Sequence, residues 1–147
     1  MNIFNNIIIV NYFLSNDQIN NCMNAFNSSK HLEKFNDRLI NIPKENTDIV
    51  RKCEDYSNLK VQWWQIIKCP VGSTFNKHKD TANKNTVASF IIFLNDNFQG
   101  GHLIFDGGIT IYPKKGRAVF FDGPNIEHEV NRNMDGDRYI VAGWFCK

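Results

Sequence analysis

From residue 61 to residue 95 the chain reads VQWWQIIKCPVGSTFNKHKDTANKNTVASFIIFLN. Short runs of β-branched and aromatic residues alternate here with turn-forming residues, a texture typical of an all-β unit. Eight such runs are predicted as strands: Val61–Lys68, Thr74–Asp80, Val87–Leu94, His102–Phe105, Ile109–Tyr112, Arg117–Phe121, Glu127–Asn131 and Arg138–Phe145. Eight short strands suit a jelly roll or a small barrel.

The residues before this unit have a mixed character. Ser15-Asn16-Asp17-Gln18 fits a helix capping box, and the apolar residues that follow it recur at helical spacing. A second helix is predicted from about Thr47 to Asn58. We therefore expect one α+β, mainly β domain over residues 1–147. In it, residues 1–60 form a helical support, with the helices packed on one sheet, and residues 61–147 form the β core.

Composition and charge exclude several classes of protein. Hydrophobic residues make up 42% of the 147 positions and charged residues 22%, which fits a soluble globular domain rather than a disordered chain. The net charge of +2 is too small to favour nucleic acid as a partner. The longest apolar runs, Ile7–Val10 and Val87–Leu94, fall well short of the roughly 20 residues that span a bilayer.

The cysteines and the N-terminal residues indicate a reducing compartment. Cys22, Cys53, Cys69 and Cys146 are far apart, without the spacing of a zinc site, and are interpreted as small core residues. The N-terminal residues lack the pattern of a secretory signal. We expect a cytoplasmic protein, located in the host cytoplasm if the source is a virus.

Two histidines and one aspartate form the candidate metal site. His78 and Asp80 share one face of a predicted strand because side chains alternate with a period of two, while Lys79 points away. This pair is weak evidence alone, but His128 on another predicted strand supplies a third ligand. Two imidazoles and one carboxylate leave one side of an octahedral ion open. Such a set suits Fe(II) that binds an organic cosubstrate and O2 together, whereas zinc would need only one open position.

Arg138 is the second candidate functional residue. By strand alternation it shares a face with Ile140, Ala142 and Trp144. A guanidinium among apolar neighbours needs a partner, and its planar fork suits a carboxylate. A dicarboxylate cosubstrate would provide one.

Several further segments occur in a characteristic order. They are Phe13–Ser15, Val71–Asp80, Phe93–Asp96, Gly100–Phe105 with its double glycine, Pro113, Gly116, Val119–Phe121, His128–Val130, Arg138-Tyr139 and Trp144-Phe145. In order and spacing they resemble the Fe(II)- and 2-oxoglutarate-dependent dioxygenases, and within them the prolyl 4-hydroxylase-like branch. The resemblance covers most of the chain and is more specific than any single motif.

The resemblance implies a fold and a set of site residues. The fold is a double-stranded β-helix, the cupin-like jelly roll. The catalytic set is His78, Asp80 and His128 on iron, with Arg138 on the distal carboxylate of 2-oxoglutarate. Ile91, Phe93, Leu103, Val130 and Trp144 align with positions that line the cosubstrate pocket.

The resemblance also implies an activity. It is hydroxylation of a protein or peptide side chain, with proline as the first expectation and with release of succinate and CO2. O2 would be the oxidant and ascorbate a reductant. Two alternatives stay open: an oxygenase of the same superfamily that acts on a nucleic acid or a small molecule, and a noncatalytic jelly-roll binding module.

Four positions refine this expectation. Cys69 and Phe93 stand where the branch often carries tyrosine, and the lost hydroxyls are expected to weaken cosubstrate binding. Collagen-modifying members usually have lysine where Arg138 stands, so the arginine argues against a collagen enzyme. His102 follows two glycines in a predicted strand and is interpreted as a structural or solvent-facing residue rather than part of the site.

Overall fold

The computed structural model describes residues 2–43 and 48–147. Its helices are α1 (Asn16–Ser28) and α2 (Asp48–Ser57). Its strands are β1 (Ile7–Val10), β2 (Glu33–Phe35), β3 (Arg38–Asn41), β4 (Lys60–Cys69), β5 (Phe75–His78), β6 (Ala88–Phe93), β7 (Gln99–Gly100), β8 (Leu103–Phe105), β9 (Ile109–Ile111), β10 (Ala118–Phe121), β11 (His128–Val130), β12 (Asn133–Met134) and β13 (Arg138–Cys146).

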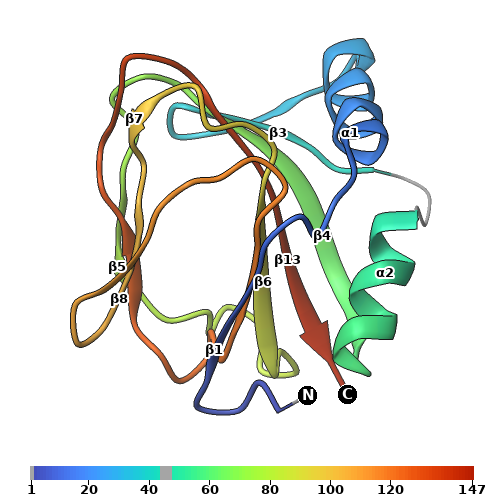
Figure 1. The fold of residues 1–147 in the computed structure, drawn as a ribbon, viewed down its shortest axis with the longest axis vertical. Coiled ribbons are helices and arrows are strands. Elements are labelled where there is room, and N and C mark those ends of the chain that lie inside the picture. Colours follow the sequence, from blue (N-terminus) through green and yellow to red (C-terminus); the bar gives the residue numbers. More distant parts are fainter. Residues whose placement is uncertain (1, 44–47) are drawn as a thin grey trace.

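Two antiparallel sheets form the body of the molecule (Figure 1). The larger sheet has the strand order β1-β10-β6-β13-β4-β3-β2, and the smaller has the order β5-β11-β8-β9. The chain crosses between the two sheets several times, for example from β4 to β5 and from β10 to β11, as in a jelly roll. The predicted mainly β jelly-roll fold is confirmed, and each of the eight predicted strands is present with its ends shifted by at most two residues.

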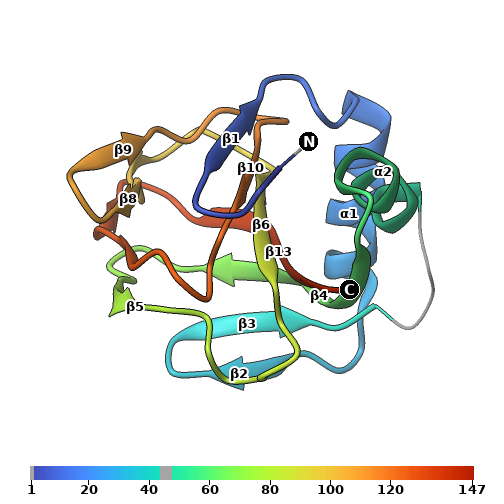
Figure 2. The same ribbon diagram turned by 90° about the horizontal axis from the view of Figure 1, so that it is seen from below.

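The two helices cover the outer face of the larger sheet (Figure 2). Ser15 caps α1 with both hydrogen bonds of the predicted capping box, since its hydroxyl accepts from the Gln18 amide and the Gln18 side chain accepts from the Ser15 amide. The buried side chains of the helices pack with those of the sheet in one apolar core: Ile19, Cys22, Phe26, Ile49, Val50 and Cys53 with Trp64, Phe90, Phe120 and Phe145. The support predicted for residues 1–60 therefore packs on one sheet.

The same N-terminal segment also contributes strands, which the sequence had not indicated. β1 pairs with β10, and the hairpin of β2 and β3 extends the sheet beyond β4. The residues before 61 are thus both a helical cover and the two edges of the larger sheet. Strand formation at an edge depends on the neighbour that is available for pairing, and local sequence reports this poorly.

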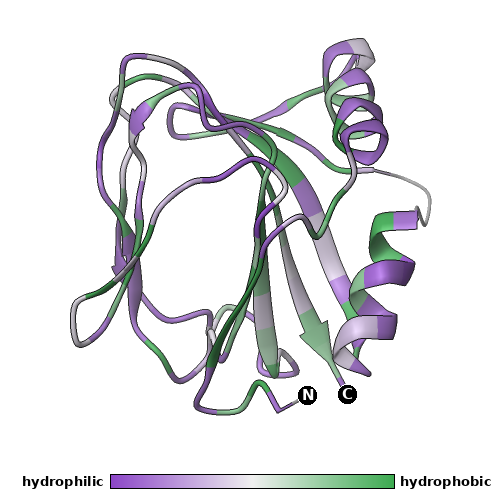
Figure 3. Cartoon of the chain, in the orientation of Figure 1, coloured by the Kyte–Doolittle hydropathy of each residue, from purple (hydrophilic) through white to green (hydrophobic). Residues whose placement is uncertain are grey.

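A second apolar core fills the space between the two sheets. It contains Ile67, Cys69, Phe93, Leu103, Phe105, Val119, Phe121, Val130, Ile140 and Ala142. Figure 3 shows hydrophobic residues along the central strand β6 and polar residues over most of α1. This inner core surrounds the candidate site.

The cysteines occur as free thiols. Cys22, Cys53 and Cys69 are buried, as predicted for core residues, whereas Cys146, at the end of β13, is only partly buried. Among residues 2–43 and 48–147, the structure shows no helix with the length and apolar character needed to cross a membrane.

Candidate metal centre

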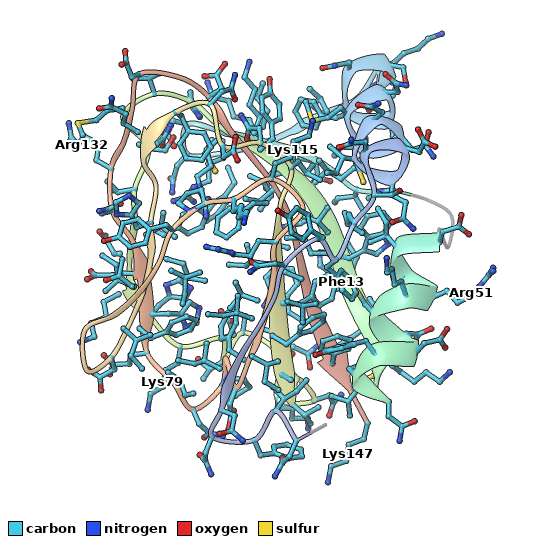
Figure 4. The ribbon with its side chains drawn as sticks, viewed as in Figure 1. Phe13, Arg51, Lys79, Lys115, Arg132 and Lys147 are labelled. Atoms are coloured by element: carbon cyan, nitrogen blue, oxygen red, sulfur yellow. The ribbon has the colours of Figure 1, made fainter. Side chains whose placement is uncertain are left out.

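The three predicted ligands meet at one end of the space between the sheets. His78 ends β5 and His128 begins β11, and the two are directly opposite partners in the antiparallel pairing of these strands. Asp80 follows β5 after one residue, and its backbone amide donates to the carbonyl of Gly123 over 2.9 Å. One ligand atom from each residue lies within 4.8 Å of the others. Lys79 between the ligands is exposed at the rim (Figure 4).

The two imidazoles are oriented for metal binding. The Nε2 atoms of His78 and His128 each lie 3.4 Å from Asp80 Oδ1. On the far side of each ring, Nδ1 faces a backbone carbonyl, that of Asn76 at 2.7 Å for His78 and that of Ile126 at 2.8 Å for His128. A carbonyl accepts only from a protonated nitrogen, so these contacts assign the proton to Nδ1 and leave the lone pair of Nε2 for a metal.

Asp80 is held by both carboxylate oxygens. Oδ1 faces the histidines, while Oδ2 accepts a hydrogen bond of 2.6 Å from the buried hydroxyl of Ser89 on β6. A Cβ atom on Gly123 would overlap the Ser89 hydroxyl, so only glycine leaves room for this contact. Oδ2 is therefore occupied by Ser89, while Oδ1 faces the two histidines.

The electrostatics favour an ionised carboxylate. Burial alone would raise the pKa of Asp80, but hydrogen bonds with His128 and His78 outweigh it and hold the pKa well below its usual range. The hydrogen bond with Asp80 in turn raises the pKa of His78. A divalent cation held by the same three side chains would likewise favour the ionised carboxylate.

The centre opens to solvent on the side of His78. The side chain of His128 is 5% exposed, whereas that of His78 is 40% exposed. Beside His78 lies an open hollow of about 490 Å³, whose walls include Gln62, Trp63 and Trp144. A molecule in this hollow would lie beside His78 and Asp80, two of the three candidate ligands.

Arg138 begins β13 and is completely buried. Its Nη1 lies 3.6 Å from Sγ of Cys69, its partner on β4, while its Nε and Nη2 have no hydrogen-bond partner. Within the described residues, no carboxylate forms an ion pair with it. A buried, unpaired guanidinium is costly, so this arrangement fits a carboxylate ligand that completes it.

One pocket joins Arg138 to the three candidate ligands. Four of the five positions predicted to line a cosubstrate pocket line it, namely Ile91, Leu103, Val130 and Trp144. The fifth, Phe93, lies under Arg138, with the guanidinium carbon 5.6 Å from its ring centroid. The lining is otherwise largely apolar, which would exclude water from the reacting groups.

The sequence did not indicate every residue of this pocket. Gln65, Phe75 and Ser89 line it as well. Ser89 had a detectable signal, because it is the one polar residue in the run Val87–Leu94 and shares its strand face with Ile91 and Phe93. His102 lies outside the cluster, with its ring against Tyr112 at a centroid distance of 4.5 Å.

The donor set fits Fe(II). Two neutral imidazole nitrogens and one carboxylate oxygen form the facial triad of non-haem iron sites, and the open side leaves positions for further ligands. The unpaired Arg138 in the same pocket fits a cosubstrate that carries a carboxylate at the end remote from the metal.

Comparison with known proteins agrees with this geometry. The family model described as the 2OG-Fe(II) oxygenase superfamily matches residues 64–146. No curated protein matches the chain in sequence.

Solved structures with the same fold include three prolyl hydroxylases. The viral collagen prolyl hydroxylase of Paramecium Bursaria Chlorella virus-1, in complex with 2OG, has a TM-score of 0.75 at 18% identity, over 95% of this chain and 94% of that one. The prolyl hydroxylase of Trichoplax adhaerens, in complex with a hypoxia inducible factor peptide, has a TM-score of 0.77 at 17% identity, over 97% and 84%. A prolyl-4-hydroxylase of Pseudomonas putida has a TM-score of 0.71 at 19% identity, over 96% and 92%.

Proposed function

We propose that this chain, which belongs to the 2OG-Fe(II) oxygenase superfamily, hydroxylates a side chain of a protein or peptide, with proline as the first candidate. The observation that carries the proposal is the position of Arg138. A buried guanidinium with two unpartnered nitrogens lines the same pocket as a two-histidine, one-carboxylate cluster. An iron site with a dicarboxylate cosubstrate accounts for both features.

Each residue would have a separate task. His78, Asp80 and His128 would hold Fe(II), and Arg138 would bind the distal carboxylate of 2-oxoglutarate. Ile91, Leu103, Val130 and Trp144 would surround the cosubstrate, and Phe93 would support Arg138. When bound, iron and 2-oxoglutarate would supply the oxidising chemistry with O2, releasing succinate and CO2. The chain itself orients these groups and excludes water.

The shape of the entrance supports a polypeptide substrate. The hollow beside His78 is open, and Trp63, 48% exposed, pairs across the strands with Trp144 at its wall. Exposed indole rings suit the apolar, rigid ring of proline. The structural neighbour from Trichoplax adhaerens is a prolyl hydroxylase in complex with a peptide. The arginine at position 138 favours a substrate other than collagen.

The first test needs no substrate. The metal-free protein would receive Fe(II) and then 2-oxoglutarate without oxygen, and the charge-transfer band of the chelated keto acid would be recorded. We expect the band in the native protein, its loss in His128→Ala and a higher 2-oxoglutarate requirement in Arg138→Met. A native protein that binds Fe(II) without developing the band would contradict the proposal and favour a noncatalytic binding module.

The second test addresses the substrate. Aerobic incubation with single-proline peptides should give a mass gain of one oxygen together with consumption of 2-oxoglutarate. Consumption without modification of any peptide, but with modification of an oligonucleotide, would move the enzyme to another branch of the superfamily.

A further inference from the structure

A second buried guanidinium lies against Phe75, which also lines the pocket. Arg38, on β3, is 6% exposed and stacks over the Phe75 ring, with its guanidinium carbon 3.3 Å from the centroid. Its Nη2 donates to the backbone carbonyl of Thr74, and its Nε has no hydrogen-bond partner. As for Arg138, no carboxylate of the described residues forms an ion pair with it.

Arg38 also lines an open hollow. Within the described residues Nη1 makes no hydrogen bond, and it is not among the fully buried nitrogens that lack a partner. Arg38 lines a hollow of about 610 Å³ together with Phe35, Thr74, Phe75 and His78, and Phe35 at its edge is 61% exposed. This hollow is separate from the one beside Trp63, but both reach His78.

The proposed cosubstrate does not neutralise Arg38. Fe(II), the Asp80 carboxylate, doubly charged 2-oxoglutarate and Arg138 together carry no net charge. Arg38 does not line the pocket that would hold them, although it stacks on Phe75, which does. The neighbouring groups are the buried thiol of Cys69, the exposed carboxylate of Asp37, which forms no ion pair with Arg38, and Arg138, which is another cation. Arg38 is therefore left as a buried cation that opens to a substrate-sized hollow.

We propose that Arg38 is an anion subsite that binds the carboxylate of an acidic side chain of the polypeptide substrate. The inference rests on the proposed function and specifies its substrate class as a peptide with Asp or Glu near the hydroxylated residue. A planar carboxylate matches the fork of one guanidinium, whereas a phosphate with two charges would need further cations. The exposed ring of Phe35 gives the neighbouring part of the peptide an apolar contact.

The subsite would also orient the substrate. Because the hollow shares His78 with the metal centre, a carboxylate on Arg38 lies beside an iron ligand. The peptide would then be fixed at two places, by Arg38 and by the hollow at Trp63 and Trp144. Two fixed places define which side chain lies over the metal.

Peptide binding tests the subsite without turnover. Protein loaded with Mn(II) and 2-oxoglutarate would be titrated with fluorescent single-proline peptides that carry Glu, Gln or Lys at each position in turn. We expect at least one Glu peptide to bind about tenfold more tightly than its Gln counterpart. Arg38→Met should remove this preference, Arg38→Lys should retain part of it, and Arg38→Glu should prefer the Lys peptide. Equal binding of Glu and Gln peptides to the native protein, or no binding at all, would overturn the proposal.

Two controls separate the subsite from other roles. The 2-oxoglutarate requirement of the charge-transfer band should be the same in Arg38→Met as in the native protein. If Arg38→Met lost the preference for the Glu peptide and also required more 2-oxoglutarate, Arg38 would belong to the cosubstrate pocket, and the proposed subsite would be wrong. If the variants fail to fold, the Nε–H resonance of Arg38 in the native protein serves instead, since it must shift with a Glu peptide and stay fixed with its Gln counterpart. Acidic peptides that bind through Arg38 but gain no oxygen would contradict the hydroxylase while leaving the subsite intact.

Discussion

The hydroxyl of Ser89 donates to Asp80 Oδ2 across 2.6 Å, so that only Oδ1 of this carboxylate faces the two histidines. Ser89 lies on the larger sheet, whereas both histidines lie on the smaller one. The carboxylate is thus held from one sheet while it serves a centre built on the other. A metal at the centre would bind Asp80 through a single oxygen.

Ser89→Ala should weaken metal binding. Without the hydroxyl, Asp80 loses the contact that fixes its plane, and such outer contacts contribute about tenfold or more to metal affinity. Titration of Fe(II) or Mn(II) against a chromophoric chelator measures the change. Ser89→Thr keeps the hydroxyl and is the matched control, while an unchanged affinity in Ser89→Ala would show that the hydrogen bond does not position the ligand.

Removal of any one ligand should abolish activity. His78→Ala, Asp80→Ala and His128→Ala each leave two of three protein ligands, so we expect loss of stoichiometric metal binding and of 2-oxoglutarate consumption. His102→Ala is the control, because this histidine packs on Tyr112 away from the centre. Normal turnover in a ligand variant would refute the assignment.

Arg138→Met should separate cosubstrate binding from metal binding. Loss of a hydrogen-bonded charge pair with 2-oxoglutarate should raise its dissociation constant by about tenfold to a hundredfold. Fe(II) affinity should stay unchanged, since Arg138 is not among the ligands. Without 2-oxoglutarate the variant should be at least as stable to urea as the native protein, because an unpaired buried charge has been removed. A marked loss of stability would indicate that the charge is already paired.

Two buried thiols should make stability fall at alkaline pH. Burial raises the pKa of Cys22 and that of Cys53 from 9.0 to about 12. In the unfolded chain these thiols ionise near pH 9, while in the folded protein they stay protonated. Their contribution is therefore complete below pH 9 and is lost as the pH rises toward 12.

Urea unfolding across this pH range measures the effect against the double variant Cys22→Ala, Cys53→Ala. The other titrating groups are common to both proteins, so the free energy of unfolding should fall more steeply with pH in the native protein. Parallel curves would show that the two thiols ionise equally in both states.

Features that depend on neighbouring residues in the sequence could be predicted, whereas features that depend on contacts between distant segments could not. The strands from residue 61 onward were predictable because each carries its own alternation and is bounded by turn residues. The strands β2 and β3 were missed because they are short and lack an alternating pattern, and they are stabilised by pairing of β2 with β3 and of β3 with β4. This pairing depends on the tertiary structure and cannot be predicted from the local sequence.

The site shows the same division. Arg138 was identified because three apolar residues alternate with it along one strand. Arg38 begins a strand of only four residues, without such a pattern, although it too is buried and has an unpartnered Nε. Ser89 was visible as a polar residue in an apolar run, but its bond to Asp80 depends on how residues 81–86 return the chain to the larger sheet. The path of these residues between the two sheets cannot be predicted from the local sequence.

Because His78 and His128 face each other, the stability of the protein would depend on the supply of iron. These residues are direct partners on neighbouring strands, so an ion bound to both would fasten β5 to β11. A metal that binds only the folded state stabilises it, and the gain grows with the logarithm of the ratio of the free metal concentration to the dissociation constant. A cell short of iron would then hold a less durable protein as well as a less active one, and abundance and activity would decline together.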